Sequence, residues 1–408
     1  MATIPISNTD LKYADVERMA PRKSFFAKLS QIMALCGRSY FSLLKEIITL
    51  RFGVGRLSFD EYIALCLYDN TLYTQAEKNK FLGLRAMQKI WLEANYRFDF
   101  FGLINNKIAT DVLLSAYGFP IMPTLAIFRD GVGRTSQFLL RSEEELRNFL
   151  TKSEYYPLFS KPIGGRQSIG TASLERYDET GKRLITTMGY GIPLDTFIAY
   201  VKNHAASGYL FQRRISPHTE IRKICGNRLA TVRLLTITMQ GGPKIIRACW
   251  KIPTGSNIAD NFWRSGNLLA QLDIESGRVL SVIRASENGF EEITHHPDTG
   301  VLIVGTVIPN WQEVTKLVTE SAKVLDEIAL IGWDIAPIDG GAVIVEINET
   351  PDFKIHQLAD RRGMWDETFI NFLAERKQHA AEWLTASKQK QQIITELVVP
   401  PQNIKGKH

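Results

Sequence analysis

The chain has 408 residues, of which 45% are hydrophobic and 23% are charged. These fractions are typical of a folded globular protein and exclude disordered and fibrous chains. Lys and Arg number 49 against 43 Asp and Glu, and the resulting net charge of +6 is too small and too evenly spread to predict nucleic-acid binding.

Two further classes do not fit. No apolar run reaches the roughly 18 residues of a membrane helix, so we expect no membrane span. The first residues lack a basic segment followed by an apolar block, which argues against a secretory signal and favours a cytoplasmic protein. The cysteines form no CxxC pair, and we expect small buried side chains in a reducing compartment rather than disulfides or zinc ligands: Cys36, Cys66, Cys225 and Cys249.

Residues 1–104 have the pattern of helices. Ser58–Glu61 and Thr74–Glu77 both have the S/T-x-x-E form of a helix start, in which side chains bond the free backbone N–H groups. Apolar residues then recur at helical spacing between Phe81 and Trp91. We predict a helical region that packs on the rest of the chain or supplies a surface for a partner or substrate.

The remainder alternates short strands and helices. In 105–157 we predict a helix from Asn106 to near Gly118, a strand at 125–128 and a capped helix from Ser142. The region 158–211 adds strands at 158–161 and 209–213, a glycine-rich loop at 163–170 and a helix at 193–204. The region 212–386 has predicted strands at 229–238, 244–251, 268–273, 279–283, 331–338 and 342–348, and helices at 310–329 and 366–386. Residues 387–408 read as a loose tail. Successive strands without regular βαβ units indicate an α+β fold.

The strand pair before Asn348 is the most informative segment. The sequence at 339–341, Asp-Gly-Gly, predicts a hairpin turn between two apolar runs. If these three residues form the loop, Ile338 lies opposite Ala342, and Asp334 lies directly opposite Glu346. A two-residue loop would shift the register and place the two acids on opposite faces.

Two opposed carboxylates predict a magnesium site. The like charges of Asp334 and Glu346 would repel each other, and their apolar neighbours indicate burial, so a bound cation is needed. Mg2+ prefers one or two carboxylates together with phosphate oxygens, and Asn348, on the same face as Glu346, adds a neutral oxygen. The alternative is a surface hairpin whose acids point to water, which the apolar neighbours do not favour.

Several residues are candidates for binding phosphate. Lys161 precedes the glycine-rich loop, whose flexible backbone and hydroxyl group suit phosphate oxygens: Gly164, Gly165, Ser168 and Gly170. This loop is not a Walker sequence, and by itself it fits a plain hairpin loop as well. Three more cations either converge on the same site or are exposed charges. They are Arg233 within an apolar strand, Lys251 at a strand end and Lys107 at a helix start. Asp260 and Asn261, in a polar loop, either hold substrate or form a turn.

The order of these residues resembles that of the ATP-grasp superfamily, whose members use ATP to join a carboxylate to an amine or another nucleophile. The matching residues are Lys107, Lys161-Pro-x-Gly-Gly-x-x-Ser-x-Gly, Gln212, Arg233, Asp334 and Glu346-Ile-Asn348. The stretches 210–218, 230–233, 260–262 and 332–336 are similar to the sugar-transfer-associated branch, which is related to alpha-L-glutamate ligases. The resemblance covers about 105–360 and implies two α+β subdomains that clasp ATP, preceded by the helical region.

The resemblance also implies roles for the matched residues. Lys107 and Lys161 would hold the phosphates of ATP, with 163–170 as a lid. Backbone groups from Gln212 to Ile215 would contact adenine, and His218 would lie near the ribose. Arg233 would be catalytic and would face the transferred phosphoryl group. Lys251, which is not among the matched residues, is the second catalytic candidate, from its place at a strand end. Asp334, Glu346 and Asn348 would bind one or two Mg2+, and Asp260 and Asn261 would contact substrate.

Two segments depart from the family pattern. The hinge reads Gln212-Arg213-Arg214, where many relatives carry an acidic residue, and 263–267 interrupts the usual paired glycines. The first departure affects the side-chain contacts that the family pattern implies for adenine. The second departure affects the binding of the substrate and not the binding of ATP.

The implied activity is a Mg-ATP-dependent ligase that forms an amide from a small carboxylate and an amine through an acyl-phosphate, in cell-surface glycan or natural-product biosynthesis. A phosphotransferase with a hydroxyl acceptor and a non-catalytic nucleotide-binding module are the alternatives. The oligomeric state stays open, with a homodimer as one option.

Overall fold

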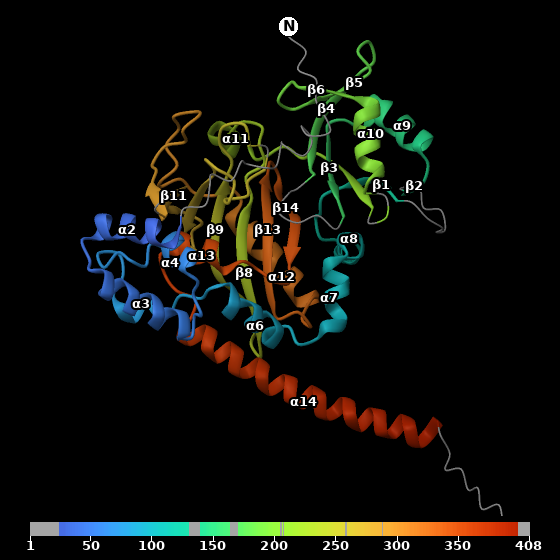
Figure 1. The fold of residues 1–408 in the computed structure, drawn as a ribbon. Coiled ribbons are helices and arrows are strands. Elements are labelled where there is room, and N and C mark those ends of the chain that lie inside the picture. Colours follow the sequence, from blue (N-terminus) through green and yellow to red (C-terminus); the bar gives the residue numbers. More distant parts are fainter. Residues whose placement is uncertain are drawn as a thin grey trace, which may run out of the picture.

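The computed structural model describes residues 24–398, apart from 130–138, 164–169, 205, 207, 258 and 288. The chain folds into two sheets with helices around them (Figure 1). The helices are α2 (Phe25–Cys36), α3 (Tyr40–Phe52), α4 (Phe59–Ala64), α5 (Gln75–Lys78), α6 (Leu84–Ala94), α7 (Phe98–Asn105), α8 (Lys107–Ala116), α9 (Glu143–Thr151), α10 (Leu194–Lys202), α11 (Thr219–Cys225), α12 (Trp311–Val324), α13 (Phe353–Asp360) and α14 (Glu367–Val398).

The strands divide into two sets that follow each other in the chain. The first sheet holds β1 (Thr124–Phe128), β2 (Leu139–Leu140), β3 (Leu158–Pro162), β4 (Ala172–Asp178), β5 (Arg183–Thr186), β6 (Gly191–Pro193) and β7 (Tyr209–Arg213). The second holds β8 (Val232–Met239), β9 (Gly242–Ile252), β10 (Leu268–Leu272), β11 (Val279–Ser286), β12 (Gly289–Glu292), β13 (Leu330–Ile338) and β14 (Gly341–Asn348). Their orders are β2-β1-β7-β3-β4-β5-β6 and β12-β11-β10-β9-β8-β13-β14, and every named pair except β1 with β2 is antiparallel. The predicted α+β meander is confirmed.

Each sheet buries one face under helices and carries polar and charged residues of the predicted site on its other face. In the first sheet, Leu158, Tyr209 and Phe211 pack with residues of α9 and α10, so the alternate residues Lys161 and Gln212 lie on the opposite face. In the second sheet, residues of β8 and β13 pack against α12: Val232, Leu234, Trp333 and Ile335. The alternate residues of those strands, among them Arg233 and Asp334, therefore lie on the other face.

The hairpin of β13 and β14 corrects one prediction. Ile338 pairs with Gly341, so the turn is the two-residue segment Asp339-Gly340, and the predicted pairing of Ile338 with Ala342 is wrong. Asp334 nevertheless pairs with Glu346 because Val345 is an extra residue that forms a β-bulge. The bulge restores the register that the shorter turn had shifted, so both acids share a face.

The C-terminal boundary also differs from the prediction. The helix predicted at 366–386 continues as α14 to Val398, so a loose tail from residue 387 is wrong for this part of the chain. Residues 387–398 contain Lys, Gln, Glu and Leu, which favour helices, and the first proline follows at Pro400. In Figure 1 α14 extends away from the two sheets.

The helical region predicted at 1–104 is confirmed for residues 24–104, which pack on the second sheet, and residues 1–23 lie outside the described residues. Both predicted capping boxes, at Ser58–Glu61 and Thr74–Glu77, are present. Gln357 of α13 accepts a hydrogen bond from the N–H of Leu82 at 2.7 Å and donates one to its carbonyl at 2.9 Å, which fixes this region to the C-terminal half. No helix among the described residues combines the length and apolar composition needed to cross a bilayer. None of the four cysteines forms a disulfide, and three of them are buried.

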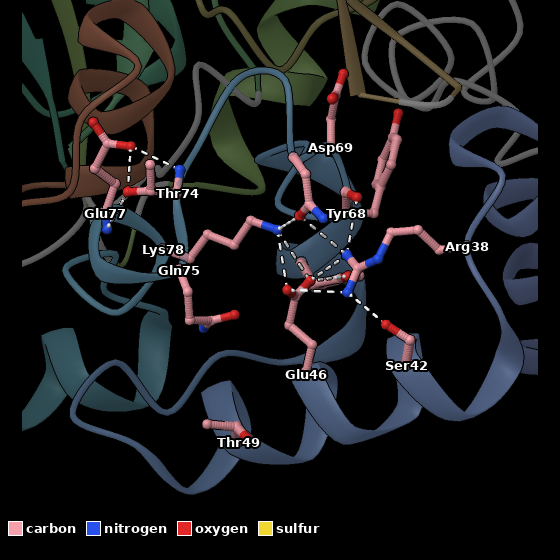
Figure 2. A network of polar contacts seen from close by, with 12 residues as sticks. Arg38, Ser42, Glu46, Thr49, Tyr68, Asp69, Thr74, Gln75, Glu77 and Lys78 are labelled. Atoms are coloured by element: carbon pink, nitrogen blue, oxygen red, sulfur yellow. Dashed lines mark hydrogen bonds and ion pairs between the residues drawn. The ribbon is translucent and has the colours of Figure 1, made fainter.

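A buried group of charges holds these helices together (Figure 2). Glu46 of α3 accepts hydrogen bonds from Arg38 at 2.9 Å, from Lys78 at 3.0 Å and from the hydroxyl of Tyr62 at 2.6 Å. Lys78 also donates to the side-chain oxygen of Asn70 at 2.6 Å. Because Glu46 and Lys78 are both buried, each charge depends on the other for compensation.

We expect Lys78→Met to lower the free energy of unfolding by about 3–5 kcal/mol, because it leaves buried Glu46 with only part of its compensation. The control is Lys89→Met, whose ammonium pairs with Glu93 on the surface and whose loss should cost about 0.5 kcal/mol or less. Urea-unfolding midpoints measure both. Equal effects of the two substitutions would contradict a stabilising role for the buried cluster.

Candidate active site

Three charged residues form one row across neighbouring strands of the second sheet. Asp334 in β13 pairs with Arg233 in β8 on one side and with Glu346 in β14 on the other. Directly opposed residues of antiparallel strands point to the same face, so the three side chains stand side by side. Lys251 lies two residues beyond Cys249, the partner of Arg233 in β9, and therefore shares this face.

Asp334 is the most enclosed carboxylate of the row. Its Oδ1 lies 2.6 Å from Nε of Arg233 and 2.9 Å from Nζ of Lys251, and its Oδ2 accepts a hydrogen bond from the Arg233 guanidinium at 2.7 Å. Burial alone would raise the pKa of Asp334, but the two cations outweigh burial and hold the pKa well below its usual range. Asp334 is therefore ionised at neutral pH.

Lys251 connects this row to the loop after β9. Its Nζ lies 3.4 Å from Oδ1 of Asp260, whose Oδ2 accepts a hydrogen bond from the N–H of Thr231 at 2.7 Å. Burial lowers the pKa of Lys251, but Asp260 and Asp334 outweigh it and raise the pKa above its ordinary value. The side chain of Asn261 instead accepts a hydrogen bond from the N–H of Trp263 at 3.1 Å, as a turn residue does.

Two lysines approach the other end of the row. Lys107, at the start of α8, places its Nζ 2.8 Å from Oε1 of Glu346. Lys161 in β3 interacts electrostatically with both of these residues, and burial, joined by the like charge of Lys107, lowers the pKa of Lys161. Burial raises the pKa of Glu346, but Lys107 and Lys161 outweigh it, so the pKa lies below its ordinary value. Lys107 of α8 and Lys161 of the first sheet thus face Glu346 of the second sheet.

Asp111 belongs to this group and was not predicted from the sequence. It lies one helical turn after Lys107 on α8 and interacts electrostatically with Lys107, Lys161 and Glu346. Burial raises the pKa of Asp111 to about 6, in spite of the two lysines. Its i, i+4 spacing from Lys107 was the only signal in the sequence, and that spacing is common on exposed helices.

His356 of α13 is a second residue that the sequence did not reveal. Its side chain is completely buried, and neither ring nitrogen has a hydrogen-bond partner among the described residues. Burial, together with the charges of Arg233 and Arg247, lowers the pKa of His356 well below its ordinary value. The ring is therefore neutral beside the row of charges.

The predicted hinge connects the two sheets. Gln212 in β7 is buried, and its Oε1 has no hydrogen-bond partner among the described residues. Ile215 lies in the link between β7 and α11 and is half-buried. The side chain of His218 caps α11, because its Nδ1 accepts a hydrogen bond from the backbone N–H of Glu220 at 3.1 Å. The backbone N–H of His218 donates a hydrogen bond to the carbonyl of Pro337 at 3.0 Å. The hinge is thereby fixed to the β13–β14 hairpin.

The glycine-rich loop is described only at its ends. Gly164, Gly165 and Ser168 lie outside the described residues. Gly170 has φ +76°, and a Cβ atom there would lie 2.3 Å from the hydroxyl oxygen of Tyr200. Only glycine fits this position, because both the backbone conformation and the space exclude a side chain.

The donor atoms fit a magnesium site in part. No three His, Cys, Asp or Glu side chains gather as a metal site within the described part of the chain, so protein carboxylates alone would not complete the coordination. Glu346 and Asn348 share a face with Asp334, and the buried Nδ2 of Asn348 has no hydrogen-bond partner among the described residues. The carboxylate oxygens of Asp334 and Glu346 and the amide oxygen of Asn348 suit Mg2+ that is also bound by substrate phosphates. Asp334 would have to exchange one of its ion pairs to take part.

The comparison with protein families identifies this arrangement. Residues 87–370 match the model described as sugar-transfer associated ATP-grasp, which covers more than half of the chain. The chain belongs to this family. The match includes every strand of the described residues, and it begins within α6, so α2 to α5 lie outside it.

Solved structures with some likeness to this ATP-grasp chain include two ligases. The ATP-grasp ligase PsnB, complexed with minimal precursor, Mg and ADP, is 15% identical, with 67% of this chain and 59% of that chain covered and a TM-score of 0.33. The D-alanine-D-alanine ligase from Coxiella burnetii is 14% identical, with 72% and 61% covered and a TM-score of 0.41. This chain thus spans about three fifths of the length of either protein. The comparison with curated proteins gives no match.

We expect Asp111→Asn to stabilise the protein at pH 8 by about 1–3 kcal/mol. The pKa of about 6 in the folded protein lies above the ordinary 3.8, so ionisation of Asp111 costs stability as the pH rises between these values. The asparagine variant avoids this cost. Urea-unfolding midpoints at several pH values should show a difference in stability between the variant and the unaltered protein. This difference should grow from about pH 4 to about pH 6 and stay constant above about pH 6. Asp326→Asn, at an exposed position, is the control, and an equal gain there would contradict the prediction.

Proposed function

We propose that this ATP-grasp protein is a Mg-ATP-dependent ligase that joins a small-molecule carboxylate to an amine through an acyl-phosphate. The observation that carries the proposal is the convergence of Lys107 and Lys161 on the cross-strand row of Arg233, Asp334 and Glu346. Such a site combines cations for phosphates with carboxylates for a metal, which phosphoryl transfer from ATP requires.

The charge balance of the site supports nucleotide binding. Four cations are matched there by four carboxylates: Lys107, Lys161, Arg233 and Lys251 against Asp111, Asp260, Asp334 and Glu346. A triphosphate would take over cations from these carboxylates, and the carboxylates would then need another positive partner. Bound Mg2+, held by Glu346, Asn348 and Asp334, would neutralise phosphate charge there.

Each cation has a distinct part in the proposed reaction. Lys107 and Lys161 hold the phosphates from α8 and from the first sheet. Arg233 offers a planar pair of N–H donors to the oxygens of the transferred phosphoryl group, where charge develops during transfer, and Lys251 adds a second cation beside it. The hinge from Gln212 to Ile215 contacts adenine through its backbone, the orphaned Oε1 of Gln212 accepts a hydrogen bond from the adenine amino group, and His218 lies near the ribose.

The reaction then proceeds between substrates. An oxygen of the substrate carboxylate attacks the γ-phosphorus as the bond to ADP breaks, and an acyl-phosphate forms. The amine attacks its carbonyl carbon, phosphate leaves, and the amine loses a proton as the amide forms. No nucleophilic side chain takes part. Cys249, opposite Arg233, is unsuited to that role because burial raises the pKa of its thiol.

We further propose substrates from cell-surface glycan or natural-product biosynthesis, in line with a family described as sugar-transfer associated, and a cytoplasmic location, which suits dependence on ATP. Residues 163–170, including Gly164, Gly165, Ser168 and Gly170, would close over the acyl-phosphate and exclude water. Asp260 and Asn261 would lie near the bound acid.

ADP release against panels of acids and amines tests the proposal. A ligase requires an acid and an amine together for full ADP release, and the product contains an amide that mass spectrometry identifies. ADP release with a single hydroxyl acceptor and a phosphorylated product would instead show a phosphotransferase. Absence of Mg-ATP binding in calorimetry would indicate a non-catalytic module.

We expect Glu346→Gln to lower kcat by at least about a hundredfold, which corresponds to about 2.7 kcal/mol. This substitution keeps the shape of the side chain and removes one metal-binding charge, while Asp334, Arg233 and Lys251 stay paired. The control is Glu143→Gln, which removes a carboxylate that is also paired with lysine and arginine but lies on α9. ADP release measured at saturating Mg2+ should fall only in the first variant, and unchanged release there would contradict the assignment.

A further inference from the structure

Helix α3 exposes an apolar stripe along its outer face. Phe41 is 80% exposed, Ile48 is 49% exposed and Phe52 is 83% exposed. Residues seven and eleven positions apart lie close to two and three helical turns apart, so these side chains line up along one side of α3. Val54, just beyond the helix, is 52% exposed as well. Exposed apolar side chains that form one continuous row, rather than being scattered singly, mark an interaction site.

The opposite face of α3 explains why the stripe points outward. Leu43 and Leu50 are buried in the core of the N-terminal helices, and Glu46, between them, is held by Arg38 and Lys78 (Figure 2). Rotating α3 to bury the stripe would break these ion pairs and would expose both leucines. The buried glutamate therefore sets the rotation of the helix, and the aromatic side chains remain in water.

Basic residues border the stripe. Lys45 and Arg51 lie on either side of it around the helix, and exposed Arg56 follows in the next turn of the chain. The one acidic residue of α3, Glu46, is buried and already neutralised by two cations. The outer face of α3 is therefore apolar along its middle and positive along its edges.

We propose that α3 binds an anionic lipid bilayer, lying flat on the surface with Phe41, Ile48 and Phe52 among the acyl chains and the basic side chains at the phosphate groups. An exposed apolar row flanked by Lys and Arg, on a helix whose opposite face is buried in the protein, suits the headgroup region of an anionic membrane surface. A second copy of this chain is the less suitable occupant, because one row of three side chains falls short of the roughly 1,200–2,000 Å2 of a stable interface. Such binding would bring the protein to lipid-anchored substrates, and it does not depend on the ligase reaction.

Co-sedimentation of the full chain with sucrose-loaded vesicles tests the proposal. We expect binding to vesicles of phosphatidylcholine with about one-third phosphatidylglycerol, weaker binding to phosphatidylcholine alone, and loss of binding at high salt. The double variant Phe41→Ser/Phe52→Ser should bind anionic vesicles at least about tenfold more weakly. Leu384→Ser, which replaces an exposed leucine of α14, is the matched control and should bind like the unaltered protein.

A second variant separates the two parts of the surface. Lys45→Gln/Arg51→Gln/Arg56→Gln keeps the apolar stripe and should lose the preference for anionic over neutral vesicles. Circular dichroism and unfolding midpoints establish that the variants fold. Absence of vesicle binding by the unaltered protein would overturn the proposal. So would a dimer, found by light scattering, that Phe41→Ser/Phe52→Ser dissociates, because a second copy would then occupy the stripe.

Discussion

The carboxylate of Asp334 can be buried only because Arg233 and Lys251 bind it from two neighbouring strands. Removing either cation would leave an uncompensated charge in the interior, at a cost of about 3–5 kcal/mol. This pairing fixes the register of β8, β9 and β13, and the same register places Glu346 at the end of the row. The ion pairs that stabilise the fold are thus the groups that ATP chemistry would use, which makes the site organised before any ligand binds.

The sequence allowed the pairing of Asp334 with Glu346 to be predicted, although the predicted turn was wrong. That prediction was made from a three-residue turn, and a two-residue turn was expected to place the two acids on opposite faces. The actual turn is shorter by one residue, and the bulge at Val345 compensates for it. A bulge inside an apolar run leaves no signature in composition, but the need to keep both acids on the site face provides a physical reason for it.

Other parts of the site could not be predicted because they depend on how distant segments pack. The role of Asp111 is visible only after α8 and the first sheet bring Lys107 and Lys161 together. His356 lies in α13, a helix that the sequence pattern did not predict, and its position beside Arg233 depends on packing that joins α13 to the N-terminal helices. For Asn261 the sequence left two roles open, substrate binding or turn formation, and in the structure its side chain accepts a hydrogen bond within its own loop.

The most direct test of the account is a crystal structure with a non-hydrolysable ATP analogue and Mn2+, whose anomalous scattering locates the metal. We predict an anomalous peak in contact with Glu346 and Asn348, with the phosphates between Lys107 and Lys161 and Arg233 turned toward the terminal phosphate. A nucleotide bound away from this row, or a metal coordinated by other residues while Lys107 stays paired with Glu346, would contradict the account.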